Sequence, residues 1–259
     1  VRLVKVPMSN LASALLVPVA LSCVLVITDA FCGAYRSHLS PRELSCRDRS
    51  WNDYTSNNHI HLPRRQPALI PLMASLSSDQ RRAMVSESTM SWIKSAVIGL
   101  NLCPWAKSAL KEGLIDIKVS DAPDANSLMN EVVGNIEEMA DSEGRETRII
   151  VTECLLANFA DYNKIANTID RKIDQMDCRG IIQLATFHPQ YQFADAEEDD
   201  VENWTNRSPY PMFHLLREIE IEEALEDYDD PDEVWQRNMR TVKEKGKCFM
   251  QQLLDRCKS

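Results

Sequence analysis

Two kinds of hydrophobic pattern alternate along residues 78–259. In some segments apolar residues recur every three or four positions, which is typical of amphipathic helices, and in others they alternate or run continuously, which is typical of strands. The pattern predicts helices at residues 78–100, 104–113, 124–139, 161–176, 211–219 and 231–254, and strands at residues 114–119, 147–152 and 181–187. The last helix reaches residue 254 only if it continues past Gly246.

Capping residues support the ends of several predicted helices. Pro104 stands in a first turn, where proline is tolerated, and Gly113 follows the end of the same helix. Asp124 or Asn126 is expected to cap the next helix, and Asp161 the one after it. These residues place the helix boundaries more narrowly than the hydrophobic pattern does.

Predicted helices and strands take turns from residue 78 to residue 187. Parallel neighbouring strands need crossover helices of this kind, so we expect an α/β fold. Its sheet would be small and mostly parallel, with three or more strands, and a helical extension would follow at the C-terminus. An α+β fold with the first strand antiparallel at an edge is the alternative. No linker or internal repeat divides residues 78–259, which predicts a single domain.

Residues 1–30 have the pattern of a signal peptide. The stretch from Leu11 to Ile27 is almost wholly apolar, and small residues follow it up to Ala30. A signal anchor is the alternative, because the apolar run has about the minimum length for a membrane span. If cleavage occurs near Ala30, the mature protein has no stable membrane span.

Residues 31–77 are rich in serine and arginine and show no sustained periodicity, which is typical of a disordered transit peptide. The junction between Ala30 and Phe31, followed by such a segment, resembles the bipartite plastid leaders of algae with secondary plastids. That resemblance implies a plastid location. The secretory pathway, or a signal-anchored protein, is the alternative.

Charge and cysteine content limit the partners of residues 76–259. The chain has a formal net charge of −10, and this segment holds 21 basic against 35 acidic residues. An acidic surface repels phosphate backbones, and no basic stripe of the needed length is present, so we expect no nucleic-acid partner. Five of the eight cysteines lie here, without a CxxC pair or zinc-finger spacing, which favours reduced thiols.

Polar residues whose side chains can bind ligands or react follow the predicted strands. His188 comes directly after the third strand, and Thr152, Glu153 and Cys154 lie at the end of the second. Ligands of parallel sheets bind at the carboxyl ends of the strands, so we expect a site at this edge. The flanking residues 187–193 and 203–211 are rich in amides, prolines and aromatic side chains, a composition typical of binding loops.

Cys103 is the candidate nucleophile. It precedes the helix at residues 104–113, whose N-terminus is expected to return to the same edge, and helix N-termini favour a thiolate. With His188 or His214 nearby, Cys103 would act as a nucleophile or redox-sensitive thiol, and His188 as the catalytic acid or base. The alternatives are a small buried cysteine and a histidine that hydrogen-bonds a loop carbonyl at the strand end.

Five further residues are candidates for binding an anionic substrate. Arg207 presents a planar guanidinium for a carboxylate or phosphate. His214 and Arg217 lie three positions apart and share one face of the predicted helix. The complete set is Asn206, Arg207, Tyr210, His214 and Arg217. The alternatives are a bridge from Arg207 to an acidic helix and an ordinary polar pair on an exposed helix face.

Metal and nucleotide signatures are missing from the sequence. Cys103, Glu153, Asp161, His188 and His214 are suitable ligand types for zinc or iron, but no His-x-His or HExxH spacing connects them. No GxGxxG or P-loop motif is present either. We therefore assign no metal ligand, and the sequence names no cofactor.

Three separated motifs resemble a known family. They lie at residues 97–107, at residues 187–193 and at residues 203–218, and in the right order they resemble the domain-of-unknown-function family 1415 (DUF1415). The resemblance extends over about residues 92–246. Trp105 and Trp204 stand where the family is expected to have Phe and Tyr. The resemblance implies a bacterial-type domain and supplies no reaction.

Three functional hypotheses follow from these residues. The first is an enzyme that acts on a small anionic metabolite with Cys103 and His188. The second is a non-catalytic metabolite-binding or regulatory module that uses the same loops, and the third is a metal-binding domain. The sequence does not indicate the oligomeric state.

Overall fold

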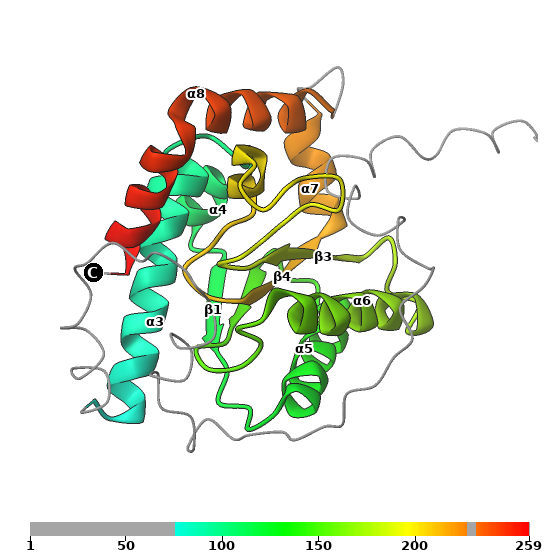
Figure 1. Ribbon diagram of the computed structural model, residues 1–259. Coiled ribbons are helices and arrows are strands. Elements are labelled where there is room, and N and C mark those ends of the chain that lie inside the picture. The colour runs from blue at the N-terminus through cyan, green and yellow to red at the C-terminus, as the bar shows by residue number, and fades with distance from the viewer. Residues whose placement is uncertain (1–75, 227–231, 259) are drawn as a thin grey trace, which may run out of the picture.

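The computed structural model describes residues 76–226 and 232–258 (Figure 1). The predictions of a signal peptide and a plastid leader concern residues 1–77, and all but the last two of these lie outside the described residues. Within the described ranges, no helix has the length and apolar character needed to cross a membrane.

Helices and strands follow one another largely as the hydrophobic pattern predicts. The first half holds α3 (Ser78–Trp92), the π-helix η2 (Ile93–Ile98), α4 (Ala106–Glu112), β1 (Ile115–Val119), α5 (Ala125–Ala140) and β2 (Thr147–Val151). The second half holds α6 (Phe159–Gln175), β3 (Ile182–Phe187), the 3₁₀ helix η3 (Val201–Thr205), β4 (Met212–Arg217), α7 (Glu218–Leu225) and α8 (Asp232–Cys257).

The four strands form one mixed sheet in the order β1-β2-β4-β3. β1 and β2 are parallel, and β4 is antiparallel to both of its neighbours, β2 and β3. The three strands predicted from the sequence therefore all run in the same direction. The antiparallel strand lies inside the sheet and not at an edge. The architecture fits an α/β or α+β description.

The helix predicted at residues 211–219 is wrong, because most of this segment forms β4. Met212, Leu215 and Leu216 satisfy helical spacing, but Phe213 is also fully buried, so both faces of the segment are apolar. A short apolar run of this kind cannot be assigned to helix or strand from periodicity alone. Central strands covered on both faces have such continuous apolar sequences. Helix α7 begins only at Glu218.

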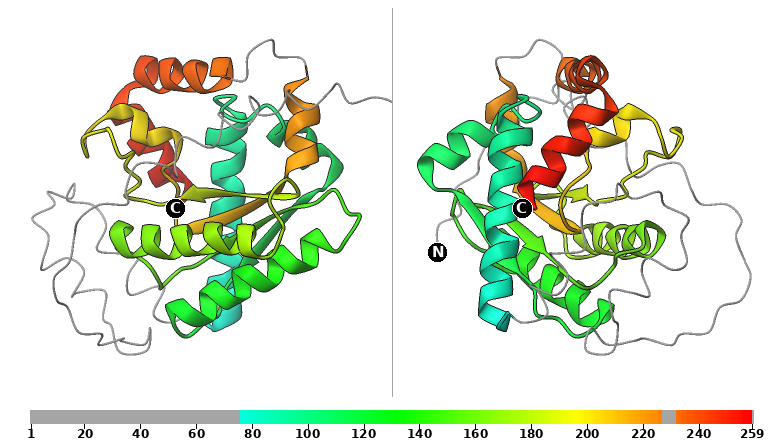
Figure 2. Two further views of the ribbon diagram at one scale, coloured as in Figure 1. Left: turned by 90° about the vertical axis from the view of Figure 1, so that its right-hand side faces the viewer. Right: turned by 60° about the vertical axis from the view of Figure 1, so that its left-hand side comes forward.

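Helices cover both faces of the sheet (Figures 1 and 2). On one face α5 and α6 bury Ile150, Phe213 and Leu215. On the other face α3, η2 and α8 bury Ile149, Val151 and other residues. Because side chains alternate along a strand, neighbouring residues of β3 and β4 point into different layers.

Caps and one glycine determine where several helices begin and bend. Asp124, and not Asn126, caps α5, because its carboxylate accepts a hydrogen bond from Ser127 N at 2.8 Å. Asn158 caps α6, so the prediction of Asp161 as the cap is wrong. Helix α8 does continue past Gly246, but it kinks there because this glycine has φ 75°.

Candidate functional site

The carboxyl ends of β1, β2 and β3 meet at one edge of the sheet, together with the start of β4. His188 follows β3, Glu153 follows β2, and Tyr210 precedes β4. This edge is where ligands bind in open α/β sheets. We call it the carboxyl edge.

His188 is completely buried and holds two segments of backbone together. Gln190 N donates a hydrogen bond to Nδ1 at 2.9 Å, so the proton resides on Nε2, which donates to the Leu156 carbonyl at 2.9 Å. The ring packs beside Phe159 and Tyr162 with centroid distances of 5.3 and 5.0 Å. Burial lowers the pKa of His188 to about 4, and the charge of Lys258 lowers it further. In this arrangement His188 is a neutral histidine that hydrogen-bonds a loop carbonyl.

Amide side chains organise the loop between β3 and β4. Asn203 is fully buried, and its amide accepts a hydrogen bond from Phe193 N and donates one to the Glu197 carbonyl. The Asn206 side-chain amide donates a hydrogen bond to the Thr186 carbonyl at 3.1 Å, and the Asn206 backbone carbonyl accepts one from His188 N at 3.2 Å. These groups satisfy buried backbone atoms, which is a structural role.

Arg207 clamps the same loop. Its guanidinium donates to the carbonyls of Tyr191 at 3.2 Å and Glu198 at 2.8 Å, and it lies over the ring of Trp204 at 4.8 Å. Burial lowers the pKa of Arg207, while Glu198 and Asp199 counteract this effect. With two carbonyl partners already bound, the guanidinium is engaged inside the loop.

His214 and Arg217 lie apart, because they belong to a strand and not to a helix. Their side chains point to opposite faces of the sheet. Thr147 Oγ1 donates to the Leu215 carbonyl at 2.9 Å, so His214 Nε2 donates to that hydroxyl at 2.6 Å. Burial lowers the pKa of His214 to about 4. Arg217 lies at the opposite end of β4 from the carboxyl edge, where it donates to Ser142 Oγ at 2.8 Å and to Glu146 at 3.1 Å.

Cys103 lies on the face of the sheet opposite to His188. It packs against the cluster that contains Trp105, Ala185 and Leu216, whereas His188 packs against α6. His214 points to the same face as Cys103. The structure therefore does not bring Cys103 and His188 together.

The environment of the Cys103 thiol has two opposing effects on its acidity. Burial raises the pKa of the thiol and is the larger effect. The backbone N–H groups of Trp105 and Ala106 at the start of α4, together with the charge of Arg237, lower the pKa in part. On balance the thiol is a weaker acid than an exposed one.

A second group of polar side chains surrounds Tyr210 at the carboxyl edge. Burial raises the pKa of the Tyr210 phenol, the Glu153 carboxylate raises it further, and the adjacent Ser88 hydroxyl lowers it. Lys258 Nζ lies over the Tyr210 ring at 5.9 Å from its centroid. We call Ser88, Glu153, Tyr210 and Lys258 the Tyr210 cluster.

Two members of the Tyr210 cluster lack a normal polar partner. Ser88 is 7% exposed, and among the described residues its Oγ forms no hydrogen bond of normal geometry. In the same described part of the chain, Lys258 Nζ is partly buried and forms no ion pair within 4.0 Å, although the charge of Asp255 acts on it. Buried polar groups are usually hydrogen-bonded, so a hydroxyl and an ammonium in this position are candidates for contact with a ligand.

Glu153 adds an acid to the Tyr210 cluster. Burial raises the pKa of its carboxyl group, and Arg81 counteracts part of this effect from 3.7 Å. The sequence predicted the edge position of Glu153, but it gave no signal for Ser88 or Lys258. Ser88 lies on α3 and Lys258 directly follows α8, and the packing of these two helices against the edge is decided by tertiary structure.

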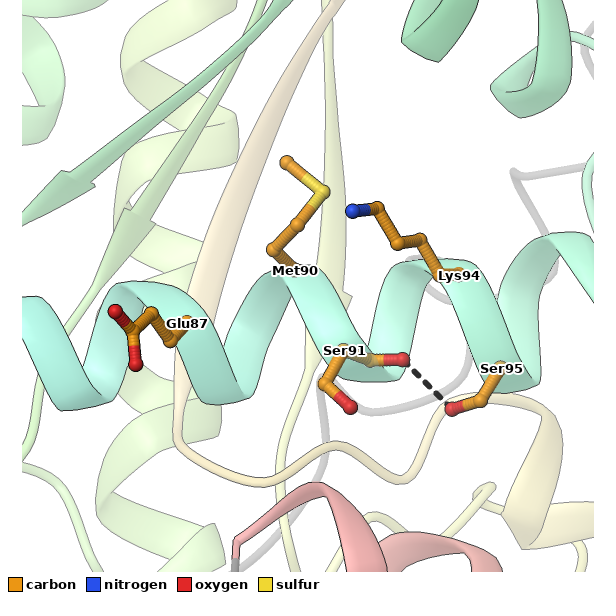
Figure 3. Close-up of a pocket in the computed structure, with 5 residues that line it drawn as sticks. All are labelled: Glu87, Met90, Ser91, Lys94 and Ser95. Atoms are coloured by element: carbon orange, nitrogen blue, oxygen red, sulfur yellow. Dashed lines mark hydrogen bonds between the residues drawn. The ribbon is translucent and has the colours of Figure 1, made fainter.

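The surface hollow shown in Figure 3 is separate from the Tyr210 cluster. It has a volume of about 490 Å³ and is lined by Glu87, Met90, Ser91, Lys94 and Ser95, all on α3 and η2. Ser95 Oγ donates to the Ser91 carbonyl at 2.7 Å, which satisfies this hydroxyl within the helix. No residue predicted to bind or react lines the hollow, so we assign no ligand to it.

Metal-ligating side chains do not gather in the described ranges. Within residues 76–226 and 232–258, no three His, Cys, Asp or Glu side chains are placed to hold a metal ion together. The five cysteines of these ranges are all free thiols.

Comparison with known proteins identifies the family. A family model described as "Protein of unknown function (DUF1415)" matches residues 84–252, which is more than half of the 259 residues. Searches of curated proteins and of solved structures found no match. The family match contains the motifs around Cys103, His188 and Arg207, and it ends before Lys258. The chain therefore belongs to the DUF1415 family of proteins of unknown function.

Proposed function

We propose that this protein binds a small anionic metabolite at the Tyr210 cluster. The observation that carries the proposal is the ammonium group of Lys258, which is partly buried beside the Tyr210 ring and, in the described ranges, forms no ion pair within 4.0 Å, although the charge of Asp255 acts on it. A partly desolvated cation attracts an anion more strongly than one in bulk water does. The Ser88 and Tyr210 hydroxyl groups can donate hydrogen bonds to the same ligand.

Thermal denaturation in the presence of anions tests this proposal. A ligand that binds only the folded state stabilises it by about 2.7 kcal/mol at a hundred times its dissociation constant. We expect acetate or phosphate to raise the melting temperature of the wild type more than chloride does at equal ionic strength. Lys258→Met should abolish this difference. The matched control is Lys245→Met, since Lys245 is exposed and lies over Phe249.

Two outcomes contradict anion binding at this site. One is a wild type whose melting temperature responds equally to acetate, phosphate and chloride. The other is a Lys258→Met variant that keeps the full anion-dependent shift, since the anion would then bind elsewhere. Circular dichroism of the variants at 20 °C shows whether each remains folded.

An enzyme that uses Cys103 is the second candidate function. What favours it is the pair of backbone N–H groups, from Trp105 and Ala106, that point at the thiol. In this case His214, on the same face of the sheet, is better placed than His188 to serve as the base. Replacement by Cys103→Ser separates the two candidates, because binding at the Tyr210 cluster should survive it and thiol chemistry should not.

The subcellular location is a separate proposal. We propose that residues 1–77 direct the domain to a plastid, on the basis of the apolar run from Leu11 to Ile27, the expected cleavage point near Ala30 and the serine- and arginine-rich segment after it. A fluorescent protein fused after residue 77 and expressed in an alga with a secondary plastid tests this. Fluorescence in the secretory pathway alone would contradict it.

A further inference from the structure

The strand β1 forms one edge of the sheet, and within the described ranges it pairs only with β2 (Figure 1). Ser120 N, directly after β1, donates a hydrogen bond to the Val151 carbonyl of β2 at 2.8 Å. Because the backbone groups of successive strand residues point to opposite sides, this bond fixes which residues of β1 face β2. The N–H and C=O groups of Ile115, Ile117 and Val119 therefore point away from the sheet.

The outer side of β1 is only partly covered. None of the five residues of β1 is fully buried, whereas all five residues of β2 are. The side chains of Ile115, Ile117 and Val119 pack against the cluster beneath α3 and α8, but each remains partly exposed. Unpaired N–H and C=O groups on an edge strand can pair with a further strand.

The opposite edge of the sheet, at β3, is closed by the chain itself. Ile182 is completely buried, and its N–H group donates to the Cys178 carbonyl at 3.0 Å. The Asn206 side-chain amide donates to the Thr186 carbonyl at 3.1 Å. Both bonds occupy backbone groups on the side of β3 that faces away from β4. A head-to-tail assembly, in which β1 of one copy pairs with β3 of the next, is therefore hindered.

We propose that β1 pairs with β1 of a second copy of this chain, antiparallel and about a two-fold axis that passes beside Ile117. Ile117 then lies opposite the partner's Ile117, and Ile115 lies opposite the partner's Val119. Each of these pairs exchanges two backbone hydrogen bonds, so every outward-pointing N–H and C=O group of β1 finds a partner. The sheets of the two copies join into one continuous sheet. The pairing does not depend on the proposed anion site.

The charges of β1 favour this partner and this register. Asp116 lies opposite the partner's Lys118, and Lys118 lies opposite the partner's Asp116, in pairs whose side chains approach most closely. The two side chains are 37% and 35% exposed, so each can reach across the axis in addition to its contact with Arg148 or Asn135. A lysine on an edge strand usually opposes pairing, but here the aspartate two positions away compensates for it. A register shifted by two residues would place like charges opposite each other, which is unfavourable.

Sedimentation of the full chain as a function of concentration tests the proposal. We expect a dimer that dissociates on dilution. Lys118→Glu places an acid opposite Asp116 on both sides of the axis, so it should raise the dissociation constant of the dimer by about tenfold or more. The matched control Lys164→Glu makes the same charge change at an exposed position of α6, beside β3, and should leave the dissociation constant unchanged. Circular dichroism shows whether both variants remain folded.

Hydrogen exchange of single amides, measured by NMR, tests the pairing without any substitution. The amides of Ile115, Ile117 and Val119 should exchange more slowly as the concentration rises and the dimer forms. The amides of Asp116 and Lys118 face β2, so they should be protected at every concentration.

Three results would overturn the proposal. The first is a chain that stays monomeric at every concentration. The second is a dimer in which the Ile117 amide exchanges as fast as in the monomer, since the copies would then associate through another surface. The third is a folded Lys118→Glu variant that dimerises as tightly as the wild type.

Discussion

We expect acidification to destabilise the protein through His188. The ordinary pKa of histidine is 6.5, and burial lowers that of His188 to about 4 in the folded protein. In this range the unfolded chain binds the proton more tightly than the folded one. The stability that depends on neutral His188 is therefore complete above pH 6.5 and is lost as the pH falls towards 4. The pKa difference corresponds to about 3 kcal/mol.

The structure explains why protonation cannot be accommodated. Nδ1 accepts from Gln190 N, so a second ring proton would face a backbone N–H group, which is itself a donor. The ring is also completely buried against Phe159 and Tyr162, where water cannot solvate a charge. Acid must therefore either break this hydrogen bond or unfold the loop.

Guanidinium chloride denaturation at pH 7 and pH 4 measures the effect, with fluorescence of the buried tryptophans as the signal. Glutamine at position 188 can still donate to the Leu156 carbonyl but does not titrate between these pH values. His188→Gln should lower stability at pH 7 by about 1–3 kcal/mol through lost packing and hydrogen bonding. Between pH 7 and pH 4, the free energy of unfolding of His188→Gln should fall by about 3 kcal/mol less than that of the wild type. An equal loss in both proteins would refute the reasoning. His214, whose pKa is also about 4, should contribute a similar and separate loss.

Three other measurements test the described packing. Asn203→Ala leaves buried backbone groups of the loop without partners, so unfolding should be easier by about 1–3 kcal/mol, and an unchanged melting temperature would contradict the loop's hydrogen bonding. Gly246→Ala should lower the free energy of unfolding by about 1 kcal/mol, because Gly246 has a positive φ. Gly134→Ala, at an exposed helical position, should raise it by about 0.5–1 kcal/mol. If both variants changed the stability in the same direction, the kink at Gly246 would be contradicted. Cys103 should react with iodoacetamide at pH 7.5 more slowly than the exposed Cys154, because burial raises the pKa of its thiol, and a faster reaction of Cys103 would instead favour a thiolate nucleophile.

Hydrophobic periodicity was a good guide to segments with one clear period. The predicted strands at residues 114–119, 147–152 and 181–187 correspond to β1, β2 and β3, and the spacing of the predicted helix at residues 124–139 corresponds to α5. Periodicity failed for β4, because a strand buried on both faces loses its alternation. That one segment changes the sheet from mostly parallel to mixed, since β4 inserts between β2 and β3.

The candidate site could be predicted only in part. The sequence indicates that His188 and Glu153 lie at the carboxyl edge, because each directly follows a predicted strand. It does not indicate that His188 already has two backbone partners, or that Arg207 is occupied by two carbonyl groups. The predicted catalytic role of Cys103 with His188 requires that both lie at one edge and on one face, and the structure places the two residues on different faces of the sheet.

The sequence by itself determined the order of most elements, the family, and the presence of polar residues at the strand ends. Tertiary structure decided which of these residues meet. The physical reason is that periodicity records whether a position is buried, but not against what. Phe187 and His188 are neighbours in the chain, yet they point to opposite layers because successive side chains alternate across a strand. Lys258 and Tyr210 are far apart in the chain, yet they lie together because α8 packs against η3, which shortly precedes Tyr210, and against α3.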